Sequence, residues 1–426
     1  PTGTNFGEGY QKMEVDQIQF SGRQSLFEAS TLNFGLATTK TKNRSIFKNV
    51  QGQSWGGVAG NFDQSMWHPA RLGDYFGELE GSNAPNQTQL FNTFNFEQVR
   101  NAAIAISGRP QDYTPTLENP DYDRGTVEKS KSLYLQMNTE WTLAGMPVHT
   151  GIGVRYEKTD VLSTTRAATP VSVDWLTQNE MRINTEGTTF VQDTGSYSNV
   201  LPSLDFDIEP RSDVKLRASY GETIGRPLYN EIIASRSLTA QMNLSGASGT
   251  AGNPGLKPVK SKNLDISAEW YYTKQSMLSL GVFHKSLSNY AGQSVVAGTE
   301  PGLLTPIGGP RYRAALAAGG CAESNTTCIR NYIFNNYRGT PGVVQTSAGP
   351  NAFGLIEGVI TGIAGDPVLT SNVTTPVNEK NDKLKGVEFN VQHMFGTSGF
   401  GIQANYTKVK SGLQYNNFSR GNQFAL

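Results

Sequence analysis

The sequence has 426 residues, with 36 basic and 36 acidic side chains and a formal net charge of zero. It contains no basic stripe, which excludes nucleic acid as an expected partner, and no apolar run long enough for a transmembrane helix. Hydrophobic residues make up 37% and charged residues 17%, while Gly, Phe and Tyr number 46, 20 and 17, a composition typical of β-structure with polar loops.

The chain opens with Pro1-Thr2-Gly3-Thr4, which has neither the charged start nor the apolar core of a secretory signal. Either a signal was removed or the sequence begins inside a longer protein, and we expect the second. Further along, residues 95–106 within the first long polar stretch predict a short helix.

Alternation of apolar and polar residues is the main structural signal. Between residues 148 and 158, Val148 and Val154 point to one face of an extended chain and Arg155 and Glu157 to the other. The same pattern recurs along the sequence and predicts an all-β fold. We expect about ten strands, near residues 11–20, 28–40, 130–142, 147–162, 197–209, 213–225, 260–273, 277–290, 383–395 and 400–411.

The lengths of the strands and of their connections indicate a membrane barrel. Many segments reach the ~9–11 residues that cross a bilayer. Aromatic residues gather near strand ends, as in an interfacial girdle: Trp141, Tyr156, Trp270, Tyr271, Tyr272 and Phe395. Short turns at 143–147, 209–213, 273–276 and 396–399 alternate with long polar stretches at 41–125, 162–196, 225–260 and 291–382. We predict an antiparallel transmembrane β-barrel with short periplasmic turns and long extracellular loops.

An open sheet would leave two unpaired edges in the membrane, which lipid does not tolerate. We therefore expect the barrel to be partial at both ends of the sequence. Closure of ten strands as a small barrel is the alternative, but small barrels rarely carry loops of this length.

Two cysteines, Cys321 and Cys328, lie in one polar stretch. One interpretation is a disulfide that pins a loop in an oxidising compartment, and the other is two free thiols. The four histidines, at 68, 149, 284 and 393, are scattered without zinc-type spacing. We therefore expect no metal site and no cofactor.

Several charged residues fall on the polar face of the predicted strands. In a barrel they would face the lumen and pair with one another or with a plug: Arg155, Glu157, Arg217, Asp265, Glu269, Lys285 and Glu388. Paired carboxylates also occur in glycosidases, but a lumen network explains these positions without catalysis. We therefore expect no catalytic residue and no enzyme activity.

Six runs resemble motifs of TonB-dependent outer-membrane receptors, in particular of a proteobacterial subfamily tied to oligosaccharide uptake. These runs are Gly153-Val-Arg-Tyr-Glu-Lys-Thr159, Leu201-Pro-Ser-Leu-Asp-Phe-Asp207, Leu216-Arg-Ala-Ser-Tyr-Gly-Glu-Thr-Ile-Gly-Arg-Pro227, Gly252-Asn-Pro-Gly-Leu-Lys-Pro258, Asn263-Leu-Asp-Ile-Ser-Ala-Glu-Trp-Tyr271 and Leu384-Lys-Gly-Val-Glu-Phe389. Each motif alone is weak, but their order and spacing between residues 150 and 410 are specific. The first 125 residues match less clearly.

The resemblance implies that residues 1–426 are part of a barrel of ~22 strands whose lumen holds a plug. No N-terminal plug, TonB-contact segment (TonB box) or terminal barrel strand is visible in the sequence. It further implies an outer-membrane receptor of a Gram-negative bacterium that contacts TonB through the absent plug. We expect a monomer surrounded by outer-membrane lipid, which takes up an oligosaccharide or otherwise a ferric siderophore.

Aromatic side chains in the long polar stretches are candidates for ligand binding, because flat rings stack on sugar faces. Packing of the loops onto themselves is the alternative for most of them. The aromatic candidates are Trp55, Trp67, Tyr75, Trp175, Tyr312, Tyr332 and Tyr337. Arg226 and Asn253, each before a proline, complete the set, either as a framework for a ligand loop or as simple strand punctuation.

Three other functions share parts of this pattern. A passive porin would have the same strands but no plug. An extracellular carbohydrate-binding β-protein would be soluble without detergent. A secreted sugar hydrolase would lose cleavage activity when Glu269 or Glu388 is replaced.

Overall fold

The computed structural model of the chain describes residues 4–52, 62–79, 81, 84, 86 and 88–412. The chain divides into two compact units. The smaller unit comprises Pro1–Lys12 and Arg44–Asp123, and the larger comprises Met13–Asn43 and Arg124–Leu426. Among the described residues, no helix is long and apolar enough to cross a membrane.

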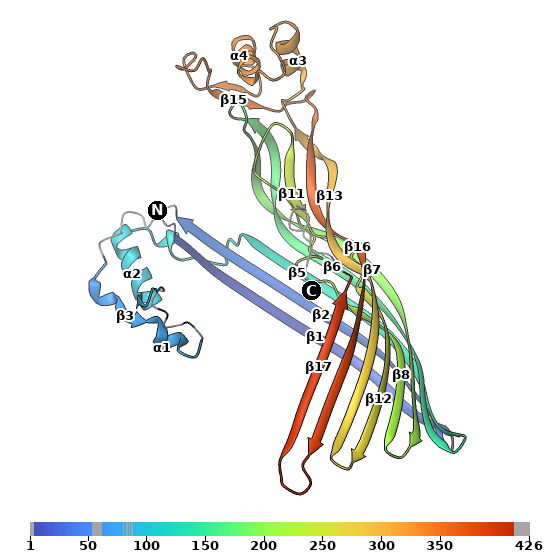
Figure 1. Cartoon of the computed structure of the whole chain (residues 1–426). Helices are drawn as coiled ribbons and strands as arrows, with labels where there is room; N and C mark the ends of the chain where they lie inside the picture. Colours follow the sequence, from blue (N-terminus) through green and yellow to red (C-terminus); the bar gives the residue numbers. More distant parts are fainter. Residues whose placement is uncertain are drawn as a thin grey trace. The chain divides into compact units, whose positions relative to one another are not determined.

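The larger unit is organised by long strands that follow one another in the sheet in nearly the order of the chain (Figure 1). The long strands are β1 (Thr4–Phe27), β2 (Ser30–Gly52), β5 (Tyr122–Leu143), β6 (Met146–Trp175), β7 (Met181–Arg211), β8 (Val214–Gly225), β12 (Val259–Thr273), β13 (Ser276–Leu304), β16 (Val368–Met394) and β17 (Gly401–Ser411). From β5 to β17, each pairs with the next in antiparallel register. Every strand predicted from alternation is confirmed.

Several strands extend further than predicted at the ends opposite the short turns. Residues 162–196, expected to be a loop, instead continue β6 and β7 as a paired hairpin, for example at Arg166 opposite Phe190. The ends of β13 and β16 continue in the same way, with Val295 opposite Thr374. Alternation reports a difference between the two faces of a strand. Apolar residues of these extensions fall on both faces, as at the adjacent residues Phe190 and Val191 or Val295 and Val296, so alternation does not reveal them.

The turns at one end of the sheet are short, as predicted. Strand β5 ends at Leu143 and β6 begins at Met146. The two residues between them, Ala144 and Gly145, have φ angles of 50° and 81°. Positive φ at both central positions is the geometry of a type I′ hairpin turn, whose twist matches that of the flanking strands.

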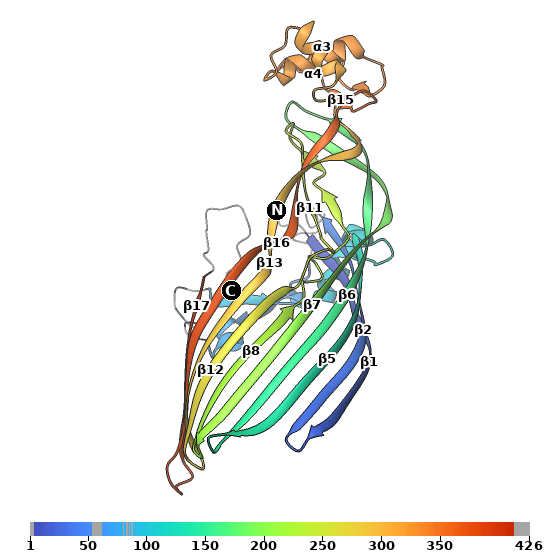
Figure 2. The same cartoon turned by 90° about the vertical axis from the view of Figure 1, so that its right-hand side faces the viewer.

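One face of the sheet exposes apolar residues and the other covers polar residues, which is the reverse of the arrangement in a soluble protein. Apolar residues of the alternating strands are exposed, among them Met137, Ile152, Leu204, Ile266, Leu280 and Phe389. Residues that alternate with them, such as Glu157 and Thr159, are buried. A contiguous exposed apolar face of this kind marks a surface that meets lipid. Figure 2 shows the strands that carry it, side by side from β5 to β17.

Rings gather on this apolar face close to the short turns. Trp270 and Tyr272 have ring centroids 5.3 Å apart, and Tyr272 stacks on His393 at 5.9 Å. His393 in turn meets Phe395 edge to face at 4.8 Å. Such a row at the end of the apolar band corresponds to the aromatic girdle of a membrane barrel.

Long connections of the larger unit fold into short elements. The connection between β8 and β12 (the inward loop, residues 226–258) contains β9 (Arg236–Leu238), β10 (Gln241–Met242) and β11 (Ala247–Ala251). The connection between β13 and β16 (the loop module, residues 305–367) contains α3 (Pro310–Ala317), α4 (Thr326–Tyr337), β14 (Val343–Gln345) and β15 (Gly358–Thr361). Neither α3 nor α4 was predicted. Both lie beyond the far ends of β6 and β13 (Figure 1).

The smaller unit combines the outer ends of β1 and β2 with β3 (His68–Arg71), α1 (Leu72–Phe76), β4 (Leu90–Thr93) and α2 (Phe96–Ser107), and with the 3₁₀ turns Gln64–Met66 and Pro110–Asp112. Helix α2 confirms the helix predicted for residues 95–106. The Asn95 side chain caps its start by accepting from the Gln98 backbone N–H, and Gly108 ends it with φ of 64°. Its Ala103 packs with Phe6 and Tyr113.

Candidate functional site: the polar face and its loops

The polar face of the sheet carries ion pairs both within a strand and between neighbouring strands. On β8 and β12, Arg217 Nε donates to Glu269 Oε1 at 3.0 Å, and the Tyr271 hydroxyl donates to the same carboxylate at 2.6 Å. On β6, Arg155 Nη2 donates to Glu157 at 2.9 Å. Four of the seven residues predicted for the lumen are thus brought together as two pairs.

The other three predicted lumen residues lie on the same face without a carboxylate–cation pair between them. Asp265 is opposite Ser219 on β8 and Phe283 on β13. Lys285 Nζ lies 5.6 Å from the centroid of the Phe283 ring. Glu388 is opposite Gly281 on β13 and Thr407 on β17.

Arg226, at the start of the inward loop, connects this loop to the polar face. Its Nη2 donates to Glu157 Oε1 at 2.9 Å and to Ser130 Oγ at 2.8 Å, and its Nη1 lies 3.7 Å from Glu128 Oε2. Both carboxylates are buried, so a cation between them offsets the cost of removing their charges from water. The tether joins β5, β6 and the loop.

Apolar packing completes this tether. Ile232 and Leu256 of the inward loop are buried against Val161 and Tyr197 of β6 and β7. The loop backbone approaches β7 so closely that a Cβ built on Gly195 would lie 1.9 Å from the Pro254 carbonyl oxygen. Glycine is therefore required at residue 195, because the inward loop occupies the space that a side chain would fill.

Asn253, the other polar loop candidate, bonds to backbone on two sides. Its Nδ2 donates to the Pro376 carbonyl oxygen at 3.0 Å, and its Oδ1 accepts from the Gly255 backbone N–H at 3.0 Å. These bonds fix the return of the loop against β16 and occupy both ends of the amide.

Tyr229 donates its hydroxyl to Glu128 Oε2 at 3.1 Å. Burial, together with the neighbouring negative charge of Glu128, raises the pKa of Tyr229 to about 12. The phenol therefore stays protonated and supplies a second donor to the carboxylate that Arg226 faces.

The loop module has its own hydrophobic core, which also includes the tips of β6 and β7. Trp175 and Tyr312, two of the predicted ligand-binding residues, lie in this core with ring centroids 6.1 Å apart. Trp175 is fully buried and Tyr312 is 5% exposed, so their rings pack inside the module and are not on its surface.

A buried guanidinium holds the module together. Arg330 of α4 donates to the carbonyl oxygens of Trp175 at 2.7 Å, Leu176 at 2.9 Å and Gly358 at 2.7 Å. Its Cζ also lies 5.1 Å from the centroid of the Trp175 ring. Burial lowers the pKa of Arg330 to about 10. One side chain thus ties α4 to the end of β6 and to β15.

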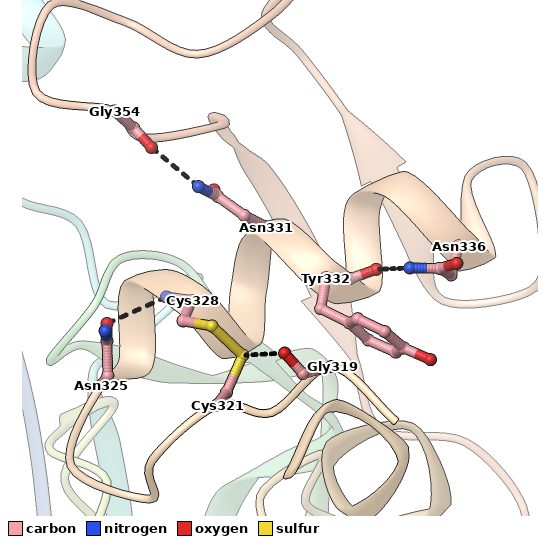
Figure 3. The surroundings of a disulfide bond; sticks show 8 residues. All are labelled: Gly319, Cys321, Asn325, Cys328, Asn331, Tyr332, Asn336 and Gly354. Carbon is pink, nitrogen blue, oxygen red and sulfur yellow. Dashed lines mark hydrogen bonds between the residues drawn. A yellow bond between two sulfur atoms is a disulfide. The ribbon is translucent and has the colours of Figure 1, made fainter. Parts of the chain in front are cut away.

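The two cysteines are joined by a disulfide that links the segment after α3 to the first turn of α4 (Figure 3). Their Cα atoms lie 5.6 Å apart. Asn325 caps α4 by accepting from the Cys328 backbone N–H at 3.0 Å. Cross-link and cap together define where α4 begins.

The remaining aromatic candidates that the structure describes are at least partly accessible. Tyr332 and Tyr337 on α4 are half-buried, with Asn336 donating to the Tyr332 carbonyl oxygen at 2.8 Å (Figure 3). In the smaller unit, Tyr75 is 61% exposed, and Trp67 meets the Phe94 ring edge to face at 5.3 Å. Trp55 lies outside the described residues.

One group of side chains in the described chain has the donor types of a metal site. Ligand atoms of His149, Asp207 and Glu209 lie within 4.8 Å of one another on the polar face. Lys215 Nζ, however, lies 3.0 Å from Asp207 and 3.2 Å from Glu209. A lysine cation therefore already pairs with both carboxylates.

Sequence reasoning missed Glu128 and Ser130, which contact Arg226, and Tyr229, which donates to Glu128. Strand parity could have found the first two, because they share a face with Gln136 and Asn138 of β5. No local signal points to Tyr229 or to Arg330, since their contacts depend on how long loops fold back.

Several solved structures of receptors resemble the chain at low sequence identity. The solved structures that resemble the chain include the hemophore receptor HasR of Serratia marcescens, solved as a double mutant with its hemophore HasA and heme (13% identity, TM-score 0.43, covering 95% of this chain and 42% of that one). They also include the siderophore receptor PiuA of Acinetobacter baumannii (12%, 0.41, 95% and 39%) and the ferric yersiniabactin uptake receptor FyuA of Yersinia pestis (10%, 0.41, 96% and 37%).

The chain thus spans about four tenths of the length of these structures. A comparison with curated protein sequences found no match. The model of the TonB-dependent receptor-like β-barrel family matches residues 1–426, the whole of the sequence. The chain therefore belongs to the TonB-dependent receptor-like β-barrel family.

Proposed function

We propose that the chain is the barrel portion of an outer-membrane receptor that takes up a nutrient with energy delivered through TonB. One observation carries the proposal: an exposed apolar face and an ion-paired polar face alternate on the same strands, in a chain that matches the receptor family over its whole length. In this reading the apolar face meets outer-membrane lipid and the polar face lines the lumen. The receptor is a monomer of a Gram-negative outer membrane.

The unpaired charges of the polar face support a plug inside the barrel. Asp265, Lys285 and Glu388 face the lumen, and among the side chains that the structure describes none of opposite charge lies directly opposite them on the neighbouring strands. An N-terminal plug domain, belonging to a longer protein, would supply polar partners for them. TonB acts through that plug, because the outer membrane has no energy source of its own.

The substrate we propose is an oligosaccharide, with a ferric siderophore as the second candidate. Tyr332 and Tyr337 are partly accessible on α4, beside the exposed Asn335 and Asn336. Rings that stack on sugar faces and amides that bond hydroxyls suit a neutral glycan. No covalent step is proposed, since Glu269 is held by Arg217 and Tyr271.

The test is uptake by cells that express the full-length receptor, with and without TonB. Energised uptake should stop when TonB is deleted, whereas a passive porin would continue to conduct. Binding of labelled oligosaccharides and of ferric siderophores to the purified receptor then identifies the substrate class.

Site variants refine this test. Replacement of Tyr332 and Tyr337 by Ala should weaken glycan binding by about ten-fold or more, as expected for the loss of stacked rings. The matched control is Phe400→Ala, which removes an exposed ring in the short turn before β17. Equal binding by all variants would contradict the role of α4.

A further inference from the structure

Strand β7 has an open edge over the segment that continues beyond the apolar band. On one side, β6 pairs with nearly the whole of β7. On the other side, β8 pairs with β7 only from Ser203 to Arg211, and β10 pairs with it only at Met181 and Arg182. Among the strands that the structure describes, none pairs with residues 184–202 on this second side. An unpaired edge of this length is a template for a further strand.

The backbone groups that face the open edge can be assigned residue by residue. Lys260 Nζ donates to the Val200 carbonyl oxygen at 3.3 Å from the side of β8 and β12, so the backbone of Val200 faces away from β6. In an antiparallel strand, the N–H and C=O of one residue point to the same side, and successive residues alternate. The register with β6 is regular over residues 188–208. The backbone groups of these further residues therefore also face the open edge: Thr188, Phe190, Gln192 and Thr194.

A second contact supports this assignment. The Thr194 backbone N–H donates to Asp193 Oδ1 at 2.8 Å, as expected for an N–H that points away from the ladder with β6. This bond occupies the Thr194 donor. The edge thus offers the N–H and C=O groups of Thr188, Phe190 and Gln192 to a partner, at a repeat of about 6.8 Å along the strand.

The open edge is exposed and has the composition of a pairing strand. All of residues 185–194 are exposed, and Phe190 is 61% exposed. Threonine, phenylalanine and valine favour strands, and residues 188–194 contain no lysine or proline of the kind that protects strand edges. A register shift beside Gly187, whose φ is 63°, limits the regular edge to residues 188–194.

Two acidic side chains flank this edge. Glu186 and Asp193 are both exposed, and no salt bridge within the described part of the chain reaches either of them. Opposite charges on neighbouring strands stabilise their pairing, and like charges destabilise it. A strand that fits this edge therefore carries lysine or arginine near its ends.

We propose that residues 188–194 of β7 bind an extended, basic polypeptide segment of a separate protein, which adds to the sheet as a further strand. A polypeptide strand presents donors and acceptors at the repeat of this edge, whereas sugars and lipids have no such repeat. Two receptors upright in one membrane would present this edge in the same direction. Pairing between copies would then place Asp193 beside its own equivalent, which disfavours a second copy as the occupant.

This inference goes beyond the proposed transport, because the edge serves neither the substrate nor TonB. The test measures amide hydrogen exchange of the full-length receptor in detergent. The probe is a synthetic peptide of alternating threonine and valine with a lysine at each end. At about ten times the dissociation constant of the peptide, exchange at Thr188, Phe190 and Gln192 should slow by about ten-fold, because only unoccupied receptor exchanges.

Two modified peptides separate strand addition from other kinds of binding. Methylation of the peptide's alternate backbone nitrogens removes the donors that face the receptor and should abolish the protection. Replacement of both lysines by glutamate should weaken binding, because these ends then repel Glu186 and Asp193. Equal binding of the methylated and unmethylated peptides would overturn the proposal.

A matched pair of receptor variants tests the edge itself. Gln192→Pro removes an N–H that faces the open edge and keeps the ladder with β6, as proline on an edge strand can. It should weaken peptide binding by about ten-fold, since a peptide carbonyl loses its donor. Gln192→Ala keeps the N–H and should bind as the native sequence does. Exchange at Thr189 and Val191, whose N–H groups face β6, should be unchanged in both variants and shows that the hairpin is intact.

Two further results would count against a separate polypeptide as the occupant. Undiminished peptide binding by Gln192→Pro would show that the peptide binds elsewhere. A receptor that is dimeric without peptide, and that Gln192→Pro converts to a monomer, would show that a second copy occupies the edge.

Discussion

Arg226 and Glu157 lie 69 residues apart in the sequence and face each other at 2.9 Å. The carboxylate comes from the polar face of β6, and the guanidinium comes from the first residue after β8. Ser130 and Glu128 of β5 extend the same contact. A loop is thereby fixed against the polar face of the sheet.

Breaking this ion pair should release the inward loop. In Glu157→Gln, Arg226 can still donate a hydrogen bond to residue 157, but the acceptor is no longer charged. A hydrogen bond to a charged group typically contributes about 1.5–3 kcal/mol. We expect amide hydrogen exchange in residues 226–258 to accelerate by about ten-fold or more. Glu388→Gln, on the same face but without contact to this loop, is the control. Unchanged exchange in the Glu157 variant would show that apolar packing alone holds the loop.

A side chain at residue 195 should displace the same loop sterically. Gly195→Ala places a Cβ where the Pro254 carbonyl oxygen lies, whereas a Cβ at Gly221, another strand glycine, meets nothing within 4 Å. Gly195→Ala should therefore expose the inward loop to limited proteolysis, and Gly221→Ala should not. Equal protection in the two variants would mean that the loop does not pack on β7.

Removal of the disulfide should weaken the loop module locally. The cross-link closes a short loop between Cys321 and Cys328, and chain-entropy arguments assign about 2 kcal/mol to a loop of this length. C321S/C328S should show faster hydrogen exchange in α4 and unchanged exchange in β12. Reductant should have the same effect on the unmodified receptor and none on the variant. A response of the variant to reductant would contradict this explanation.

The raised pKa of Tyr229 predicts a loss of stability at alkaline pH. Below pH 10 the phenol is protonated in both the folded and the unfolded chain, so its contribution is fully present. Between pH 10 and about 12, ionisation favours the unfolded chain, because the folded pKa is about 12. Unfolding temperatures measured across this range should fall more steeply for the native sequence than for Tyr229→Phe. Parallel curves would show that Glu128 and burial do not perturb this phenol.

Adjacent residues of β5 should respond oppositely to the same substitution. Met137 lies within the exposed apolar band and Gln136 on the polar face. A lysine near the bilayer midplane costs about 2–4 kcal/mol, whereas a lumen position tolerates one. Met137→Lys should lower the free energy of unfolding in lipid vesicles by about this amount, and Gln136→Lys should change it little. The reverse order would invert the assignment of the two faces.

The sequence by itself determined the strands that cross the membrane and the face that each residue takes. Period-2 alternation is a local property of an extended chain, so Ile266 and Glu269 could be assigned to opposite faces without tertiary information. Short turns, such as that at Ala144 and Gly145, were equally visible. Helix α2 was predicted as well, because its cap and its apolar positions are contiguous in the chain.

Only the tertiary structure decided where the strands continue beyond the band and what the long loops do. Residues 162–196 pair through backbone hydrogen bonds, which leave no mark on the side-chain pattern where apolar residues do not alternate between the two faces. The tether of Arg226 to Glu128 and Glu157 and the three carbonyls around Arg330 each join residues that are distant in the chain. Such contacts depend on the register and on the path of the loops. Neither is encoded in any single segment of the sequence.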